Sequence, residues 1–107
     1  MREIKNQTEY NELLAEGKPV LIDFYADWCG PCKVLLPTVD KLAEKHADHF
    51  NIVKVNVDRN PELSQQFGVR SIPALFFLQD GKVQENLVGI QSEAALEQKI
   101  EQYTVAA

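Results

Sequence analysis

Apolar residues along the chain form short runs with the period of β-strands, separated by longer segments with a helical period. Val20–Tyr25 is apolar on both faces except at Asp23, which is typical of a central strand covered on both sides. The Asp80-Gly81 pair predicts a tight hairpin between the last two strands. The predicted strands are a short one at Ile4 and the segments Val20–Tyr25, Ile52–Asp58, Ala74–Leu78 and Lys82–Val88.

Helices are predicted between and after these strands, from residues that start and stop helices and from apolar spacing. In the last helix, Leu96, Ile100 and Tyr103 are spaced four and three apart and share one face. Pro37 lies inside the second helix and should bend it, because proline lacks the N–H for the helical hydrogen bond. The predicted helices run from Asn6 or Thr8 to Gly17, from Pro31 to His46, from Asn60-Pro61 to Gly68, and from Ser92 onward.

The order of elements, βαβαβ followed by αββα, predicts the architecture. Strands joined through a helix run parallel with a right-handed crossover, whereas the final hairpin adds an antiparallel pair. We therefore predict an α/β fold, a five-stranded mixed β-sheet flanked by four helices on both faces. The chain has 107 residues, 45% of them hydrophobic, which matches one domain over residues 1–107.

The net charge and the hydropathy of the chain argue against nucleic-acid binding and against membrane insertion. The net charge of −5 argues against nucleic-acid binding, which needs a basic surface. No apolar stretch approaches the length of a membrane span, and the first residues lack the apolar core of a leader. We expect a soluble, cytoplasmic monomer.

The two cysteines of the chain, Cys29 and Cys32, lie where a strand pattern gives way to a helix pattern. The N-terminus of a helix favours a thiolate, so we assign Cys29 as the nucleophile of thiol–disulfide exchange. Cys32 is three residues on, close enough to resolve a mixed disulfide. Pro31 suits the first helical turn, and Gly30 allows a partner backbone to approach.

Two other interpretations of the cysteines are weaker. Cysteines buried only for packing rarely have this spacing at such a junction. A zinc site with His46 and His49 resembles finger spacing, but a continuous helix would place His46 roughly 20 Å from Cys32. We interpret the histidines as polar residues that end a surface helix, and we expect neither a metal nor a cofactor.

Asp23 is unusual because a carboxylate within an apolar strand should be buried. Burial raises the pKa of a carboxyl group, so Asp23 is a candidate acid/base for the Cys32 proton, with a purely structural role as the alternative. Lys54 could lie across the sheet from Asp23 and tune it, or extend to solvent. Trp28 is expected to be exposed beside the nucleophile, although core packing is an alternative. Two interpretations of Pro73 are open: it begins a strand, or it follows a cis peptide bond from Ile72.

Together these motifs resemble the thioredoxin family over essentially the whole chain. Trp-Cys-Gly-Pro-Cys-Lys alone is highly specific. The segments that carry the resemblance are Val20–Phe24, Trp28–Lys33, Pro37, Lys54–Asp58, Phe67–Pro73, Asp80-Gly81 and Val88-Gly89.

The resemblance implies a protein-disulfide reductase with Cys29 as exposed nucleophile, Cys32 as buried resolver and Asp23 as proton carrier near Lys54. It implies a cis Pro73 facing the dithiol, recycling by a thioredoxin reductase, and clients such as ribonucleotide reductase or methionine sulfoxide reductase. The implied apolar docking patch comprises Trp28, Gly30, Pro31, Ile72, Pro73 and Gly89.

Two residues depart from the family pattern. Tyr25 stands where a second tryptophan is common, and Ala74 where threonine is usual. The alternatives to a reductase are an oxidase or isomerase on the same fold and a binding module with an incidental dithiol. The absence of a histidine between the cysteines disfavours an oxidase, since such a histidine would stabilise the thiolate.

Overall fold

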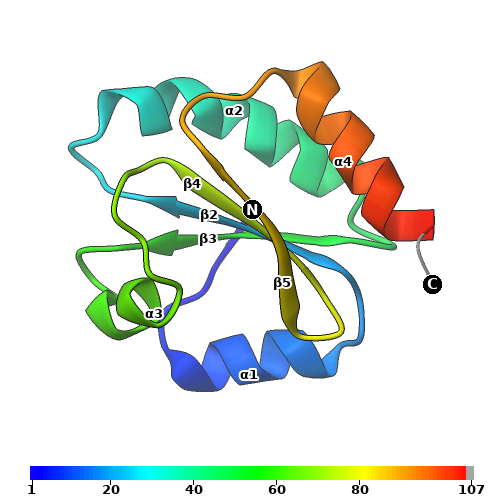
Figure 1. The fold of residues 1–107 in the computed structure, drawn as a ribbon, viewed down its shortest axis with the longest axis horizontal. Helices are drawn as coiled ribbons and strands as arrows, with labels where there is room; N and C mark the ends of the chain where they lie inside the picture. The colour runs from blue at the N-terminus through cyan, green and yellow to red at the C-terminus, as the bar shows by residue number, and fades with distance from the viewer. Residues whose placement is uncertain (106–107) are drawn as a thin grey trace.

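The five strands form one mixed sheet in the order β1-β3-β2-β4-β5, as the computed structural model of residues 1–105 shows (Figure 1). Strand β2 runs parallel to β3 and antiparallel to β4, and β5 is antiparallel to β4. The predicted α/β architecture is therefore confirmed. The strands are β1 (Arg2–Glu3), β2 (Val20–Tyr25), β3 (Asn51–Asn56), β4 (Ala74–Gln79) and β5 (Lys82–Val88).

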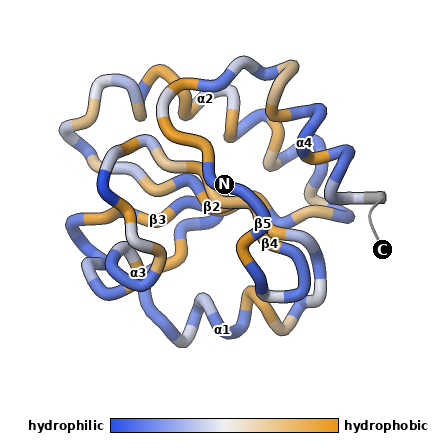
Figure 2. Tube along the Cα trace, viewed as in Figure 1, coloured by the Kyte–Doolittle hydropathy of each residue, from blue (hydrophilic) through white to orange (hydrophobic). Residues whose placement is uncertain are grey.

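Helices cover both faces of the sheet, α1 and α3 on one side and α2 and α4 on the other (Figure 1). Figure 2 shows the apolar positions concentrated along the central strands and the inner sides of the helices. Among residues 1–105, no helix is long and apolar enough to cross a membrane. The helices are α1 (Gln7–Ala15), α2 (Gly30–Lys45), α3 (Pro61–Gln66) and α4 (Glu93–Val105).

Local sequence signals set several of these boundaries. Asn6, rather than Thr8, caps α1, because its side-chain oxygen accepts a hydrogen bond from the Glu9 N–H at 2.8 Å. Ser92 does the same for α4. The expectation that Ile4 lies in the first strand is wrong by one residue: β1 ends at Glu3, and Ile4 is buried in the core.

The hairpin between β4 and β5 follows from its two turn residues. Asp80 and Gly81 have φ values of 52° and 75°, which matches a two-residue turn with both centres left-handed. The flanking residues Gln79 and Lys82 are paired. The sequence pattern therefore predicts this turn correctly.

Phe24 is fully buried at the centre of the core on the α1 and α3 side. Its ring lies 5.2 Å from that of Phe67 and 5.4 Å from that of Phe76. We expect Phe24→Ala to lower the free energy of unfolding by about 3–5 kcal/mol, because it removes buried contacts and leaves a cavity. Denaturant unfolding measures this. The exposed Val83 provides a control, since Val83→Ala should cost less than about 1 kcal/mol. A comparable loss in both variants would contradict the assignment of Phe24 to the core.

Candidate active site

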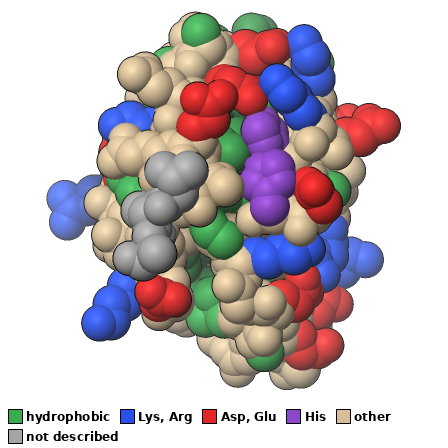
Figure 3. All heavy atoms as spheres, turned by 90° about the vertical axis from the view of Figure 1, so that its right-hand side faces the viewer, with side chains coloured by type: hydrophobic (Ala, Val, Ile, Leu, Met, Phe, Trp, Pro, Cys, Tyr) green, Lys and Arg blue, Asp and Glu red, His purple; other side chains and the backbone are tan. Residues whose placement is uncertain are grey.

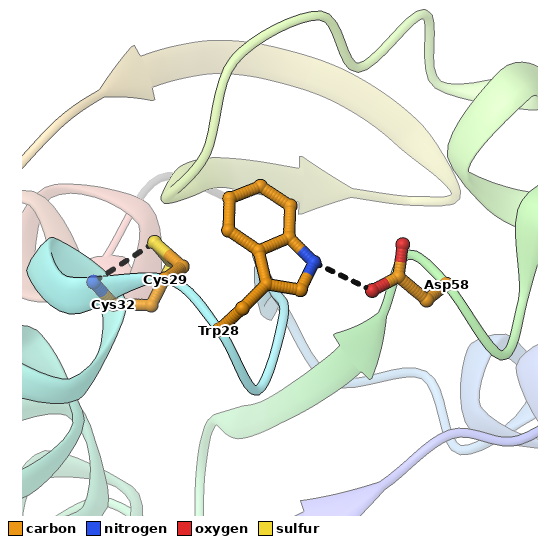
Figure 4. The surroundings of a disulfide bond; sticks show 4 residues. All are labelled: Trp28, Cys29, Cys32 and Asp58. Carbon is orange, nitrogen blue, oxygen red and sulfur yellow. Dashed lines mark hydrogen bonds between the residues drawn. A yellow bond between two sulfur atoms is a disulfide. The ribbon is translucent and has the colours of Figure 1, made fainter.

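Cys29 and Cys32 form a disulfide at the start of α2 (Figure 4). Their Cα atoms are 5.3 Å apart, within the range of ordinary disulfides. Cys29 is the residue that caps α2, and its sulfur accepts a hydrogen bond from the Cys32 N–H at 3.2 Å. The end of the helix thus directs an N–H group and its positive dipole end at the Cys29 sulfur, an arrangement that stabilises a thiolate.

Both cysteines are buried in this disulfide form, Cys29 at 4% exposure and Cys32 at 3%. The expectation that Cys29 is exposed is therefore wrong for this state. The reason is that the Cys29 side chain turns back over the helix end to cap it, and Ile72 packs against the cysteine pair. The neighbouring residues Gly30 and Pro31 are exposed.

Trp28 is exposed, as predicted, with 70% of its surface accessible. Its indole Nε1–H donates a hydrogen bond of 2.8 Å to the Asp58 carboxylate, which holds the ring beside the disulfide (Figure 4). Asp58 was not predicted as a site residue from the sequence. The signal was available, because β2 and β3 run parallel and the residues that follow them meet at the same end of the sheet.

Three chain segments meet at that end of the sheet. The pairing of Phe24 with Ala74 and of Ala74 with Val88 brings together the end of β2, the start of β4 and the end of β5. The Ile72–Pro73 peptide bond is cis, as expected, and the Pro73 carbonyl accepts a hydrogen bond of 2.8 Å from the Gly89 N–H.

Several exposed apolar side chains around this end were not predicted. Val34 follows the dithiol on α2, and Val88 and Ile90 flank Gly89. Sequence spacing could not separate them from core residues, because exposure depends on which neighbours the fold supplies.

Asp23 is buried, with 1% of its surface accessible, and pairs across the sheet with Lys54 as predicted. Burial raises the pKa of Asp23 to about 7, while the charge of Lys54 opposes this rise. Within the described residues, neither carboxyl oxygen of Asp23 has a hydrogen-bond partner. Asp23 shares its face of β2 with Leu21, which packs with α2, so its carboxyl group points toward the helix that carries Cys32. Such a group can exchange a proton near neutral pH.

A groove of about 470 Å³ borders Cys32 and Lys54. Tyr25 lines it as well, and the Lys54 ammonium lies 5.3 Å from the centre of the Tyr25 ring. Charged side chains of Glu3, Asp27, Lys33 and Arg59 complete the lining of this groove beside Cys32.

The interpretation of both histidines as surface residues is wrong for His46. His46 is 6% exposed and follows α2 directly, with Nε2 2.8 Å from the Glu97 carboxylate and Nδ1 3.0 Å from His49 Nε2. Figure 3 shows the two histidine side chains next to one another, in the upper half of the face turned to the viewer. The described residues contain no group of three His, Cys, Asp or Glu side chains arranged to hold a metal ion.

Comparison with known proteins gives a consistent result. The thioredoxin family model matches residues 2–102. Thioredoxin from Alicyclobacillus acidocaldarius is 42% identical over 91 residues, 85% of this chain and 87% of that protein. The chloroplastic M-type thioredoxin of Chlamydomonas reinhardtii is 37% identical over 94% of this chain and 71% of that protein. A point mutant of thioredoxin from Halobacterium salinarum superposes with a TM-score of 0.91 at 42% identity, over 99% of this chain and 92% of that one.

This fold, with a cysteine pair at the start of α2, defines a thiol–disulfide oxidoreductase. The chain belongs to the thioredoxin family. Members of the family act with thioredoxin reductase and with disulfide-containing clients, and they need no bound cofactor because the cysteine pair itself carries the electrons.

Proposed function

We propose that this protein is a general protein-disulfide reductase in which Cys29 is the nucleophile, Cys32 resolves and Asp23 accepts the Cys32 proton. The observation that carries the proposal is the position of Cys29 as the capping residue of α2. Its sulfur accepts a hydrogen bond from the Cys32 N–H. Of the two sulfurs, this one receives the positive end of the helix dipole.

The reaction takes two steps. The Cys29 thiolate attacks one sulfur of a client disulfide, which forms a mixed disulfide and releases the other client sulfur as a thiolate. Cys32 then loses its proton to Asp23 and attacks the Cys29 sulfur, which releases the second client thiolate and forms the Cys29–Cys32 disulfide. The client gains the electron pair that the dithiol loses. Lys54 is proposed to favour the charged form of Asp23.

Clients would dock on the apolar surface at the end of the sheet. We assign Trp28, Gly30, Pro31, Ile72, Pro73 and Gly89 to this surface, and the exposure of Val34, Val88 and Ile90 extends it. An extended client segment next to its disulfide can bury apolar side chains there, which holds the sulfur in place for attack.

The cellular setting is part of the proposal. We propose a single-domain monomer (residues 1–107) in the cytoplasm that is recycled by a thioredoxin reductase. Ribonucleotide reductase and methionine sulfoxide reductase are proposed clients, because the resemblance to the thioredoxin family implies them.

Insulin reduction coupled to NADPH and a thioredoxin reductase tests this function. We expect NADPH oxidation to depend on both the protein and insulin disulfide. A protein that binds but does not react would give no turnover, even with dithiothreitol as reductant. A redox titration with glutathione separates a reductase from an oxidase: equilibration well above the cytosolic glutathione potential would contradict the proposal.

A further inference from the structure

Glu3, Lys54 and Asp23 form one row across three neighbouring strands. Glu3 of β1 pairs with Lys54 of β3, and Lys54 pairs with Asp23 of β2. Residues in register on adjacent strands point to the same face of a sheet. Lys54 therefore has an acidic neighbour on each side in the row, the half-buried Glu3 on β1 and the buried Asp23 on β2. Whether Lys54 interacts mainly with Glu3 or with Asp23 depends on the other partners of each carboxyl group.

Glu3 is held by partners other than Lys54. The Tyr25 hydroxyl donates a hydrogen bond of 2.5 Å to Glu3 Oε1, and the Arg59 guanidinium lies 3.6 Å from Glu3 Oε2. Arg59 also donates to the Tyr25 oxygen at 3.3 Å, which fixes the phenol in place. Over residues 1–105, no ion pair joins Lys54 to Glu3.

Lys54 is oriented by the same tyrosine. Its ammonium lies over the Tyr25 ring, 5.3 Å from the ring centre, where a cation is attracted to the π-electrons. Tyr25 thus contacts two members of the row at once. Its hydroxyl binds Glu3, and its ring binds Lys54.

We infer that Tyr25 is a positioning residue for the exchange reaction: by holding Glu3 through its hydroxyl, it leaves the Lys54 ammonium to act on Asp23. The part played by this arrangement in catalysis rests on the proposed role of Asp23. The effect of Tyr25 on the titration of Asp23 does not depend on that role, because it arises only from the charges of Glu3, Lys54 and Asp23.

The charged and titratable groups near Asp23 come from every element around it. Lys54 contributes from β3, Glu3 from β1 and Tyr25 from β2. Lys33 of α2, Asp27 and Arg59 line the same groove, as does Cys32. Arg59 pairs with Asp27 at 2.9 Å, so these two charges offset one another locally. The cysteines do not titrate as long as they form the disulfide.

The test uses Tyr25→Phe, which removes the hydroxyl but leaves the ring and every formal charge in place. In the disulfide form, the pH titration of the Asp23 carboxyl carbon by NMR should shift upward by about half a pH unit, because Glu3 keeps only the longer contact with Arg59, at 3.6 Å, and can turn toward Lys54. Tyr103→Phe is the matched control, since Tyr103 donates a similar hydrogen bond of 2.6 Å to Glu85 away from the dithiol. It should leave the titration of Asp23 unchanged.

A second variant identifies Glu3 as the competitor. Tyr25→Phe should have no effect on Asp23 in a Glu3→Gln background, because the neutral amide cannot attract Lys54. An unchanged Asp23 titration in Tyr25→Phe, or an equal shift with Glu3→Gln present, would overturn the inference.

The pH profile of mixed-disulfide resolution separates the inference from the proposed function. If that profile moves together with the Asp23 titration, both are supported. If the titration moves and the profile does not, Tyr25 still positions Lys54, but Asp23 is not the base for Cys32.

Discussion

Replacing Cys32 with serine should convert the protein into a covalent trap for its clients. Cys29 can still attack a disulfide, but no second sulfur is present to release the client. We expect insulin-reduction turnover to fall by at least about a thousandfold, as when one member of a cooperating catalytic group is removed. The mixed disulfide should be visible by mass spectrometry as one client joined to Cys29.

Cys29→Ser is the matched control for this trap. It removes the same disulfide from the fold but also removes the nucleophile, so it should lose turnover and form no adduct. Because the bridge closes a very short loop, both variants should keep their stability to a similar degree, and circular dichroism can verify this. Adducts through Cys32 in Cys29→Ser would reverse the assignment of the two cysteines.

Asp23→Asn should stabilise the fold, and increasingly so as pH rises. The pKa of Asp23 is about 7 in the folded chain, against an ordinary value of 3.8. Between these values the folded state binds more protons than the unfolded state, so the free energy of unfolding falls as pH rises. At about 1.4 kcal/mol per pH unit, the full penalty is about 4 kcal/mol above pH 7. Asparagine carries no charge and lacks this penalty.

Denaturant unfolding at several pH values tests this expectation. The advantage of Asp23→Asn should be near zero at pH 4 and largest above pH 7. Asp80→Asn is a suitable control, because Asp80 is exposed in the hairpin and asparagine accepts its positive φ. A stability gain that does not change with pH would contradict a raised pKa.

The same variant should slow the resolution step. Loss of a general base typically lowers a rate by about 10²–10⁴. Resolution of the mixed disulfide by Cys32, followed by stopped-flow after rapid mixing, should therefore be slower in Asp23→Asn near neutral pH. Unchanged kinetics across the pH range would remove Asp23 from the mechanism and leave it a buried structural residue.

The elements with strong local signals were predictable from the sequence. Val20–Tyr25 and Lys82–Val88 have the predicted bounds, because an apolar run and a two-residue turn each define their own ends. Where the apolar alternation ends gradually, the predicted strand bounds are less accurate. The strand predicted over Ile52–Asp58 spans Asn51–Asn56. Its last residues leave the sheet to form the turn that carries Asp58, the partner of Trp28.

Features that depend on several segments at once were not predictable in the same way. His46 is buried because α4 brings Glu97 against it, and no local pattern around His46 specifies that neighbour. The grouping of Glu3, Tyr25 and Arg59 likewise joins three segments far apart in the sequence. The burial of Asp23, by contrast, was predictable from the local sequence, because a lone charged residue within an apolar strand is unusual.

Strand β5 lies at one edge of the sheet and so presents backbone groups to any other extended chain. Its exposed residues include Lys82, Gln84 and Asn86, and the ladder to β4 is irregular between Phe77 and Leu78. Charge and irregularity at such an edge discourage the addition of foreign strands. Of the exposed apolar side chains near the dithiol, Val34 lies on α2 and Ile90 follows β5, whereas Val88 is the last residue of this edge strand. A client that docks there meets the edge strand only at its last residue, which limits the strand pairing from which an aggregate grows.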